Sequence, residues 1–173
     1  FVTNVGNTIV SEEFWKVAGR MCAFVLDQAD PCDSAGRKEV KLGLRASYTG
    51  SIVLEDGRFP VSRRLGEEGA GLALALDFFE ASRPQVAAAA VGVARAAFEY
   101  AADYARTRQA FGKPIVDKQG ISFKLADMAM AIEASRLLVW RACDALDGGR
   151  DAGLLGSYAK AFAADTAMRV TTD

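Results

Sequence analysis

A short polar segment between two long helical patterns carries the side chains best suited to chemistry in this chain. It reads ARTRQAFGKPIVDKQ over residues 105–119. Two arginines, an aromatic ring, a lysine and an amide are gathered around its Gly-Pro turn: Arg106, Arg108, Phe111, Lys113 and Gln119. A guanidinium fork binds phosphate oxygens in pairs, and a ring stacks on a flat group. The segment therefore predicts a site for a flat, anionic, hydrogen-bonding ligand, and a nucleotide cofactor has those properties.

The residue types that are missing exclude several kinds of catalysis. The 173 residues contain no histidine, which excludes Ser-His-Asp and Cys-His chemistry and most zinc catalysis. Cys22, Cys32 and Cys143 lack the spacing of metal ligands, and their odd number fits a reducing cytoplasm better than a disulfide framework. We therefore expect no metal site, and any acid–base step must use Asp, Glu, Lys, Tyr or a bound cofactor.

Composition and charge indicate a soluble globular protein. Hydrophobic residues make up 51% and charged residues 25% of the chain, with a formal net charge of −1. That balance gives no electrostatic basis for binding nucleic acid or an anionic membrane surface. No apolar run reaches the roughly 18–20 residues of a membrane span. The abrupt ends, with Phe1 in a strand-like run and Asp173 inside an apparent helix, indicate part of a longer protein.

The first third of the chain has short β-like runs. Residues 1–10, 22–26 and 50–55 are apolar enough for strands, and an Asp/Pro/Ser/Gly cluster over residues 30–36 predicts a turn. Beyond Pro60 the pattern becomes helical.

Three long helices are expected in the remainder. Apolar residues recur at three- and four-residue steps over residues 72–104, where Pro84 either kinks one helix or splits it in two. A second pattern covers residues 119–147 and ends at two glycines, and a third runs from residue 154 to the end. Many alanines in the first helix favour close helix approach, and together the helices predict an antiparallel bundle.

Three separated motifs resemble the acyl-CoA dehydrogenase family. The first is Phe1-Val2-Thr3-Asn4. The second is Gly36-Arg37-Lys38 with Lys41-Leu42-Gly43-Leu44-Arg45-Ala46-Ser47, followed by Leu65-Gly66-Glu67-Glu68-Gly69 and Ser82-Arg83-Pro84. The third is Arg108-x-x-Phe111-Gly112-Lys113-Pro114-Ile115 with Gln119, then Leu125-Ala126-Asp127-Met128 and Ala159-Lys160-Ala161-Phe162. Their order and spacing match the family over nearly the whole chain.

The resemblance implies an α+β fold of acyl-CoA dehydrogenase type. Residues 1–62 are expected to form part of the middle β-domain, and residues 63–173 a C-terminal helical bundle that is incomplete at its end. The expected activity is FAD-dependent α,β-dehydrogenation of an acyl-CoA thioester, with hydride passing from Cβ to flavin N5 and then electrons to an electron-transfer flavoprotein. A homodimer or tetramer is expected, in a bacterial cytoplasm or, for a eukaryotic protein, in the mitochondrial matrix; we favour the cytoplasm.

The same resemblance assigns cofactor-binding roles, each with a simpler alternative. Arg108 pairs with the FAD diphosphate, often that of a neighbouring subunit, or else it is a helix-terminal arginine in solvent. Phe111 packs beside the adenine or ribose, or lies in the core beneath a turn. Gln119 bonds the cofactor or caps a helix. Thr3 contacts the flavin ring and Phe1 shields it, or Thr3 is an ordinary strand residue.

Three residues of the first helix are assigned to the substrate side. Arg83 is expected near the thioester and the catalytic base, which a cation biases toward its charged form, or else it is a surface arginine at the kink. Phe79 and Glu80 are expected to line the substrate pocket, with core packing as the alternative for Phe79.

The usual catalytic glutamate of the family has no counterpart here. It belongs to a Tyr-Glu-Gly motif beyond the third helix, and the alternative position before the Arg-Pro step is Ser82. No catalytic base is therefore assigned, and we expect no acyl-CoA turnover by this chain alone. Two other functions stay open: a flavin monooxygenase or oxidase of the same fold, and a non-catalytic assembly subunit.

Overall fold

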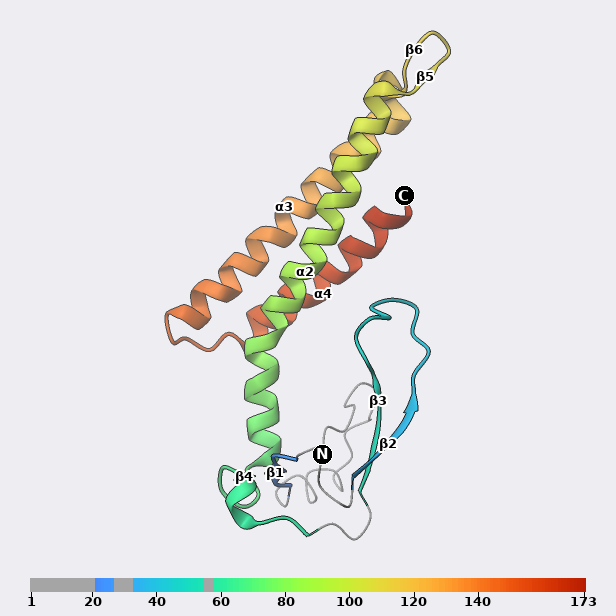
Figure 1. Cartoon of the computed structure of the whole chain (residues 1–173). Helices are drawn as coiled ribbons and strands as arrows, with labels where there is room; N and C mark the ends of the chain where they lie inside the picture. The colour runs from blue at the N-terminus through green and yellow to red at the C-terminus, as the bar shows by residue number, and fades with distance from the viewer. Residues whose placement is uncertain (1–20, 27–32, 55–57) are drawn as a thin grey trace, which may run out of the picture. The chain divides into compact units, whose positions relative to one another are not determined.

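The computed structural model describes residues 21–26, 33–54 and 58–173, and these form two compact units, Phe1–Ala75 and Leu76–Asp173. The first unit holds short strands and the second is helical, in the order expected from the sequence (Figure 1). The expected domain boundary at residue 62 stays a prediction. No helix in the described ranges combines the length and apolarity that crossing a membrane requires.

Two antiparallel strand pairs make up the described part of the first unit. β2 (Asp33–Lys38) pairs with β3 (Gly50–Leu54), and β1 (Ala23–Phe24) pairs with β4 (Arg64–Leu65), which follows the 3-10 turn η1 (Val61–Arg63). The apolar run at residues 50–55 is thus a strand, as predicted.

The turn expected over residues 30–36 is wrong for its second half, because residues 33–36 belong to β2. Asp33 pairs with Leu54 and Ala35 with Ile52. Pairing with a strongly β-prone partner strand overrides the weak strand propensity of this polar stretch.

The loop over residues 39–49 joins β2 to β3 and is fastened by its own side chains. Lys41 Nζ donates to Ser47 O at 2.7 Å and to Thr49 Oγ1 at 2.9 Å, and Arg45 Nε donates to Lys41 O at 3.0 Å. Lys41 and Arg45, which belong to the second family motif, therefore hold this loop in place through local hydrogen bonds.

α2 (Gly71–Thr107) is one continuous helix that runs through Pro84. It begins after a turn in which Gly66 and Gly69 have positive φ, and Gly71 N donates to Met21 O at 2.8 Å. A Cβ at Gly71 would lie 2.7 Å from the Cys22 carbonyl carbon, so only glycine fits there. The kinked single helix is therefore the correct one of the two alternatives, and Figure 1 shows α2 changing direction along its length.

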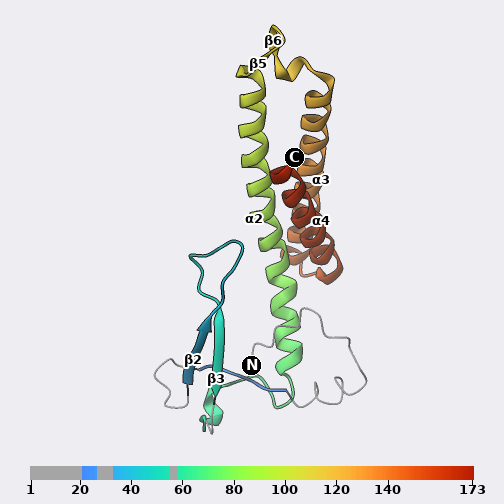
Figure 2. The same ribbon diagram turned by 90° about the vertical axis from the view of Figure 1, so that its right-hand side faces the viewer.

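α3 (Gln119–Asp147) and α4 (Gly153–Thr172) complete the bundle, close to their predicted bounds. Figures 1 and 2 show α2 and α3 side by side, with α4 packed along them. The core is built largely from small residues. One cluster contains Ala87, Val139, Ala142, Ala159 and Ala163, and the other contains Ala94, Met128, Ile132 and Val170. Because alanine is thin, the helix axes approach closely and the long exposed side chains are left on the outer faces.

Candidate functional site

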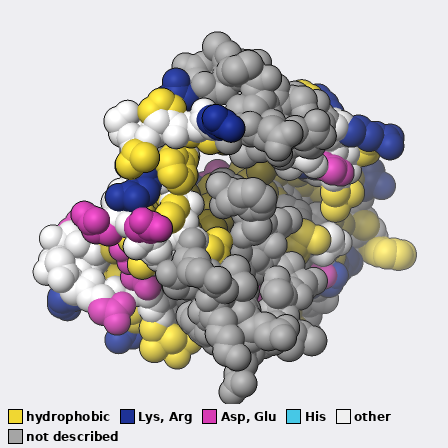
Figure 3. Space-filling view, turned by 90° about the horizontal axis from the view of Figure 1, so that it is seen from below, with side chains coloured by type: hydrophobic (Ala, Val, Ile, Leu, Met, Phe, Trp, Pro, Cys, Tyr) yellow, Lys and Arg dark blue, Asp and Glu magenta, His cyan; other side chains and the backbone are white. Residues whose placement is uncertain are grey.

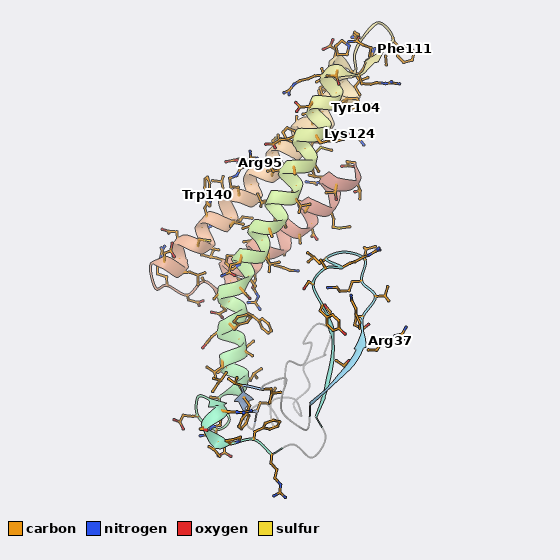
Figure 4. All side chains as sticks on the ribbon, viewed as in Figure 1. Arg37, Arg95, Tyr104, Phe111, Lys124 and Trp140 are labelled. Carbon is orange, nitrogen blue, oxygen red and sulfur yellow. The ribbon has the colours of Figure 1, made fainter. Side chains whose placement is uncertain are left out.

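The connection between α2 and α3 is a two-stranded hairpin at one end of the bundle. β5 (Gln109–Ala110) pairs with β6 (Lys113–Pro114), and the 3-10 turn η2 (Ile115–Asp117) leads into α3. We call residues 108–119 the tip hairpin. Figures 1 and 4 show it extending beyond the helices.

The two residues at the hairpin turn both have left-handed backbone conformations. Phe111 has φ 55° and Gly112 has φ 77°, the combination that matches the twist of a two-residue hairpin. Glycine adopts this conformation freely and asparagine and aspartate tolerate it, whereas other residues with a Cβ are strained in it by about 1–2 kcal/mol. The phenylalanine is 96% exposed, so burial of its ring does not offset that strain. Strain that fixes an exposed aromatic ring is typical of a binding residue.

Hydrogen bonds to Arg108 hold the base of the tip hairpin. Arg108 N donates to Tyr104 O at 2.9 Å, which continues the helical pattern, and Ile115 N donates to Arg108 O at 2.9 Å across the hairpin. The backbone is thereby fixed, while the guanidinium is exposed. Within the described residues Arg108 forms no ion pair, in contrast to Arg106, whose Nη1 lies 2.8 Å from Asp103 Oδ1.

The start of α3 adds backbone donors to the same end of the bundle. Its N-cap, Lys118, makes no side-chain cap bond, and the first turn holds no acidic residue. Ile121 N and Ser122 N both donate to Lys118 O. The positive end of a 29-residue helix is therefore left without a capping side chain next to exposed Gln119. Gln119 is the first helical residue, and its side chain makes no cap bond.

Lys118 is the residue at this site that the sequence reasoning missed. Its Nζ lies 5.2 Å from the centre of the Phe111 ring, a cation–π contact. It places a cation beside the ring, at the same end of the bundle as Arg108. The signal was present in the sequence, since a lysine stands where a helix N-cap normally has Ser, Thr, Asp or Asn.

The tip hairpin thus combines a forked cation, a lysine over an exposed ring, and an open helix N-terminus. This donor set suits a ligand that has a diphosphate and a flat aromatic group. Figure 4 shows Phe111 at the outer end of the hairpin, directed away from the helices.

The residues assigned to the substrate side lie elsewhere on α2, against the start of α4. A Cβ on Gly156 would be 3.5 Å from Arg83 Cβ and 3.5 Å from Pro84 Cδ, so the two helices cross closely there. Arg83 is half-buried at this crossing. From Arg83 to Arg108 the helix rises about 37 Å. The structure therefore brings Arg83 and Glu80 together, and keeps them apart from the tip hairpin.

Glu80 has a structural partner at the α4 N-terminus. A Cβ on Gly153 would come within 2.7 Å of Glu80 Oε1, and Gly153 N donates to Asp151 Oδ1 at 2.9 Å. Two carboxylates thus lie at the positive end of α4, where they stabilise the helix. This contact explains the position of the Glu80 side chain without a bound substrate. The assignment of Glu80 to the substrate pocket stays a prediction.

Phe79 is half-buried beside Phe78, with ring centres 6.2 Å apart, and its assignment also stays a prediction. Thr3 and Phe1 lie outside the described residues. On the face seen in Figure 3, described acidic and basic side chains are interspersed with exposed hydrophobic ones.

Comparison with known proteins agrees with this architecture. Residues 69–173 match the family model for the acyl-CoA dehydrogenase C-terminal domain. The chain is 41% identical to an acyl-CoA dehydrogenase of Bacillus subtilis (strain 168), over 100% of this chain and 47% of the relative. It is also 41% identical to the mitochondrial short-chain specific acyl-CoA dehydrogenase of Bos taurus, over 86% of this chain and 36% of the relative.

A solved structure is similar over most of the same residues. Butyryl-CoA dehydrogenase from Megasphaera elsdenii superposes with a TM-score of 0.88 at 42% identity, and the match covers 91% of this chain and 41% of that one. The chain thus spans less than half the length of each of these three proteins. The predicted fold class, strands followed by an acyl-CoA dehydrogenase helical bundle, is confirmed by this likeness. Because the family model covers more than half of the residues, the chain belongs to the acyl-CoA dehydrogenase family.

Proposed function

We propose that the protein is part of an FAD-dependent enzyme that dehydrogenates an acyl-CoA thioester between Cα and Cβ. The observation that carries the proposal is the tip hairpin, in which strained, exposed Phe111 lies beside Lys118 and in which Arg108 forms no ion pair with another described residue. When bound, FAD supplies a hydride acceptor. The contribution of the tip hairpin is to hold the diphosphate and the adenosine end of that cofactor.

Each group of the tip hairpin has a part in that binding. The guanidinium of Arg108 donates to diphosphate oxygens, and the open N-terminus of α3 offers backbone N–H groups to the same charge. The ring of Phe111 contacts the flat adenine or the ribose, and Gln119 adds amide hydrogen bonds. Lys118 contributes positive charge beside the ring.

The distance between Arg83 and the tip hairpin along α2 indicates whether one copy of the chain can bind FAD with both regions. If Arg83 lies near the reacting thioester, the tip hairpin of the same chain is about 37 Å away along the helix, which exceeds the length of an extended dinucleotide. We propose that the tip hairpin binds FAD held mainly by a second copy in a homodimer or tetramer.

The rest of the proposal follows the family. The proton acceptor is a glutamate outside residues 1–173, Thr3 and Phe1 lie beside the flavin, and Phe79, Glu80 and Arg83 face the substrate. An electron-transfer flavoprotein accepts the electrons, in the bacterial cytoplasm or the mitochondrial matrix.

An anaerobic titration tests the reaction. The intact protein, loaded with FAD, is mixed with saturated acyl-CoA thioesters of increasing length, and flavin absorbance and thioester products are followed. We expect bleaching of the flavin and formation of an α,β-unsaturated thioester without oxygen. Product formation only when oxygen is admitted would favour the monooxygenase or oxidase, and a protein that holds no flavin would favour the assembly subunit.

A further inference from the structure

The connection between β2 and β3 concentrates positive charge. Residues 37–48, which we call the basic loop, contain four cations and one carboxylate: Arg37, Lys38, Lys41 and Arg45 against Glu39. The basic loop therefore has a net charge of +3. Because the whole chain carries −1, all other residues together carry −4. Overall composition conceals this separation of charge, which gives the loop a local attraction for anions.

The four cations of the basic loop keep their charges available. Within the part of the chain that the structure describes, none of them forms an ion pair. Lys41 and Arg45 donate only to uncharged oxygens, and Lys38 Nζ lies 5.3 Å from the centre of the Tyr48 ring. Arg37 is exposed, and Figure 4 shows its side chain directed away from the strand pair.

Three aliphatic side chains lie between these cations and are almost fully exposed. The relative exposures of Val40, Leu42 and Leu44 are 92%, 93% and 84%. Leu44 also has a φ of 49°, a conformation that is unfavourable for leucine. Strain that is kept at an exposed side chain is typical of a functional position. Clustered exposed aliphatic residues mark an interaction surface.

The backbone of the basic loop is already satisfied by bonds within the hairpin. Glu39 N donates to Thr49 O at 2.9 Å, and Ser47 N donates to Leu44 O at 3.0 Å. Lys41 Nζ donates to Ser47 O as well. These bonds lower the cost of moving the loop backbone out of water, and they hold the aliphatic side chains in place before any partner binds.

We propose that the basic loop docks the protein on an anionic lipid surface. Val40, Leu42 and Leu44 enter the boundary between headgroups and acyl chains, while the flanking cations stay at the level of the lipid phosphates. A nucleic acid would match the charge and leave the aliphatic side chains in water. An acidic protein would need a hollow shaped to fit them, whereas a lipid surface accepts them without one. The inference does not rest on the proposed cofactor or reaction.

Vesicle flotation with the intact protein tests the docking. The vesicles consist of phosphatidylcholine alone or with about one third phosphatidylglycerol, which supplies the negative charge. We expect reversible binding to the anionic vesicles at about 0.1 M salt and little binding to the neutral ones. Binding to the anionic vesicles should weaken near 1 M salt, because salt screens the attraction.

Matched substitutions separate the basic loop from the rest of the surface. Arg37→Gln should lower the partition coefficient for anionic vesicles about fivefold, and Val40→Ser should lower it by a similar factor. Arg58→Gln and Val61→Ser are the controls, because both residues are exposed and lie outside the loop. They should leave the partition coefficient unchanged.

Tryptophan fluorescence tests insertion independently of affinity. Leu42→Trp places a reporter in the basic loop, and Val61→Trp places one outside it. On anionic vesicles that contain brominated acyl chains, emission from the Leu42→Trp protein should be quenched beyond the background of the unsubstituted protein. Emission from the Val61→Trp protein should not exceed that background.

The proposal is overturned if the intact protein does not bind anionic vesicles, or if it binds neutral ones equally well. It is also overturned if the Arg58 and Val61 controls lose as much binding as the loop variants. Loss of binding with Arg37→Gln but not with Val40→Ser, without quenching at position 42, would show adsorption by charge alone. In that case the aliphatic side chains would be covered by a protein partner instead of lipid.

Discussion

Replacing Phe111 by asparagine should stabilise the apo-protein while weakening its hold on the cofactor. The φ of 55° at this position strains a residue with a bulky Cβ substituent by about 1–2 kcal/mol. Asparagine tolerates this conformation, and Asn-Gly is the preferred pair for such a hairpin turn. Because the ring is 96% exposed, removing it forfeits almost no buried area.

The contact with Lys118 Nζ, 5.2 Å from the ring centre, is lost in this variant, which costs about 0.5 kcal/mol. The balance of about 1–2 kcal/mol of strain and about 0.5 kcal/mol of lost contact predicts that Phe111→Asn raises the free energy of unfolding by about 0.5–1.5 kcal/mol. The same change removes the aromatic contact with the ligand, so the dissociation constant for FAD should rise about threefold to tenfold.

The assay compares urea unfolding of the apo-protein with FAD titration of the same preparations. Tyr100→Asn is the control, because Tyr100 is an exposed aromatic residue in a regular stretch of α2. It should leave both stability and FAD binding almost unchanged, because tyrosine and asparagine have similar helix propensities. If Phe111→Asn stabilises the protein no more than the control does, the strain argument is refuted. If it binds FAD as tightly as the unsubstituted protein, the binding role of the ring is refuted.

Three further substitutions test the packing around α2. Gly92→Ala should raise the free energy of unfolding by about 1 kcal/mol, since nothing lies within 4 Å of the added methyl group and alanine is the better helix former. Gly71→Ala should lower the free energy of unfolding by about 1–3 kcal/mol, because the added methyl group would lie 2.7 Å from the Cys22 backbone. Urea unfolding that gives both glycine variants a change of the same sign would refute this packing. Glu80→Gln removes a negative charge beside Gly153 at the α4 N-terminus, which should cost about 0.3–1 kcal/mol of stability and lower the thermal midpoint at neutral pH. An unchanged midpoint would show that Glu80 does not stabilise this end of α4.

Helix periodicity was sufficient to locate the bundle. The bounds of α3 coincide with its apolar repeat and with the glycines that follow it, and α4 begins within one residue of its expected start. Strong local signals and tertiary packing agree in this part of the chain, so the pattern alone was decisive.

Features set by partner strands or by backbone geometry were not accessible from the sequence. Residues 33–36 read as a turn until their pairing with β3 is known. Pro84 left two alternatives open, and the structure shows that the helix continues through it, with Pro84 buried at the α2–α4 crossing. Pattern reasoning does not encode such long-range contacts.

For the site, the sequence identified Arg108, Phe111 and Gln119 as neighbours, and the structure adds how each is presented. The left-handed conformation of Phe111 could not be read from a Phe-Gly pair, because phenylalanine is disfavoured there. Glu80 shows the converse. Its place at the α4 N-terminus depends on a contact between residues more than seventy positions apart, which the motif did not reveal.

The central claim is that Arg108 binds the FAD diphosphate, and one matched pair of variants tests it most directly. In the intact protein, FAD dissociation constants are measured for Arg108→Lys and for Arg106→Lys, two changes that keep the charge and lie two residues apart. Because Arg106 is already paired with Asp103 on its own helix, its replacement should leave FAD binding unchanged. Loss of the bidentate fork at Arg108 should weaken FAD binding about tenfold. Equal FAD affinity in both variants would contradict the account.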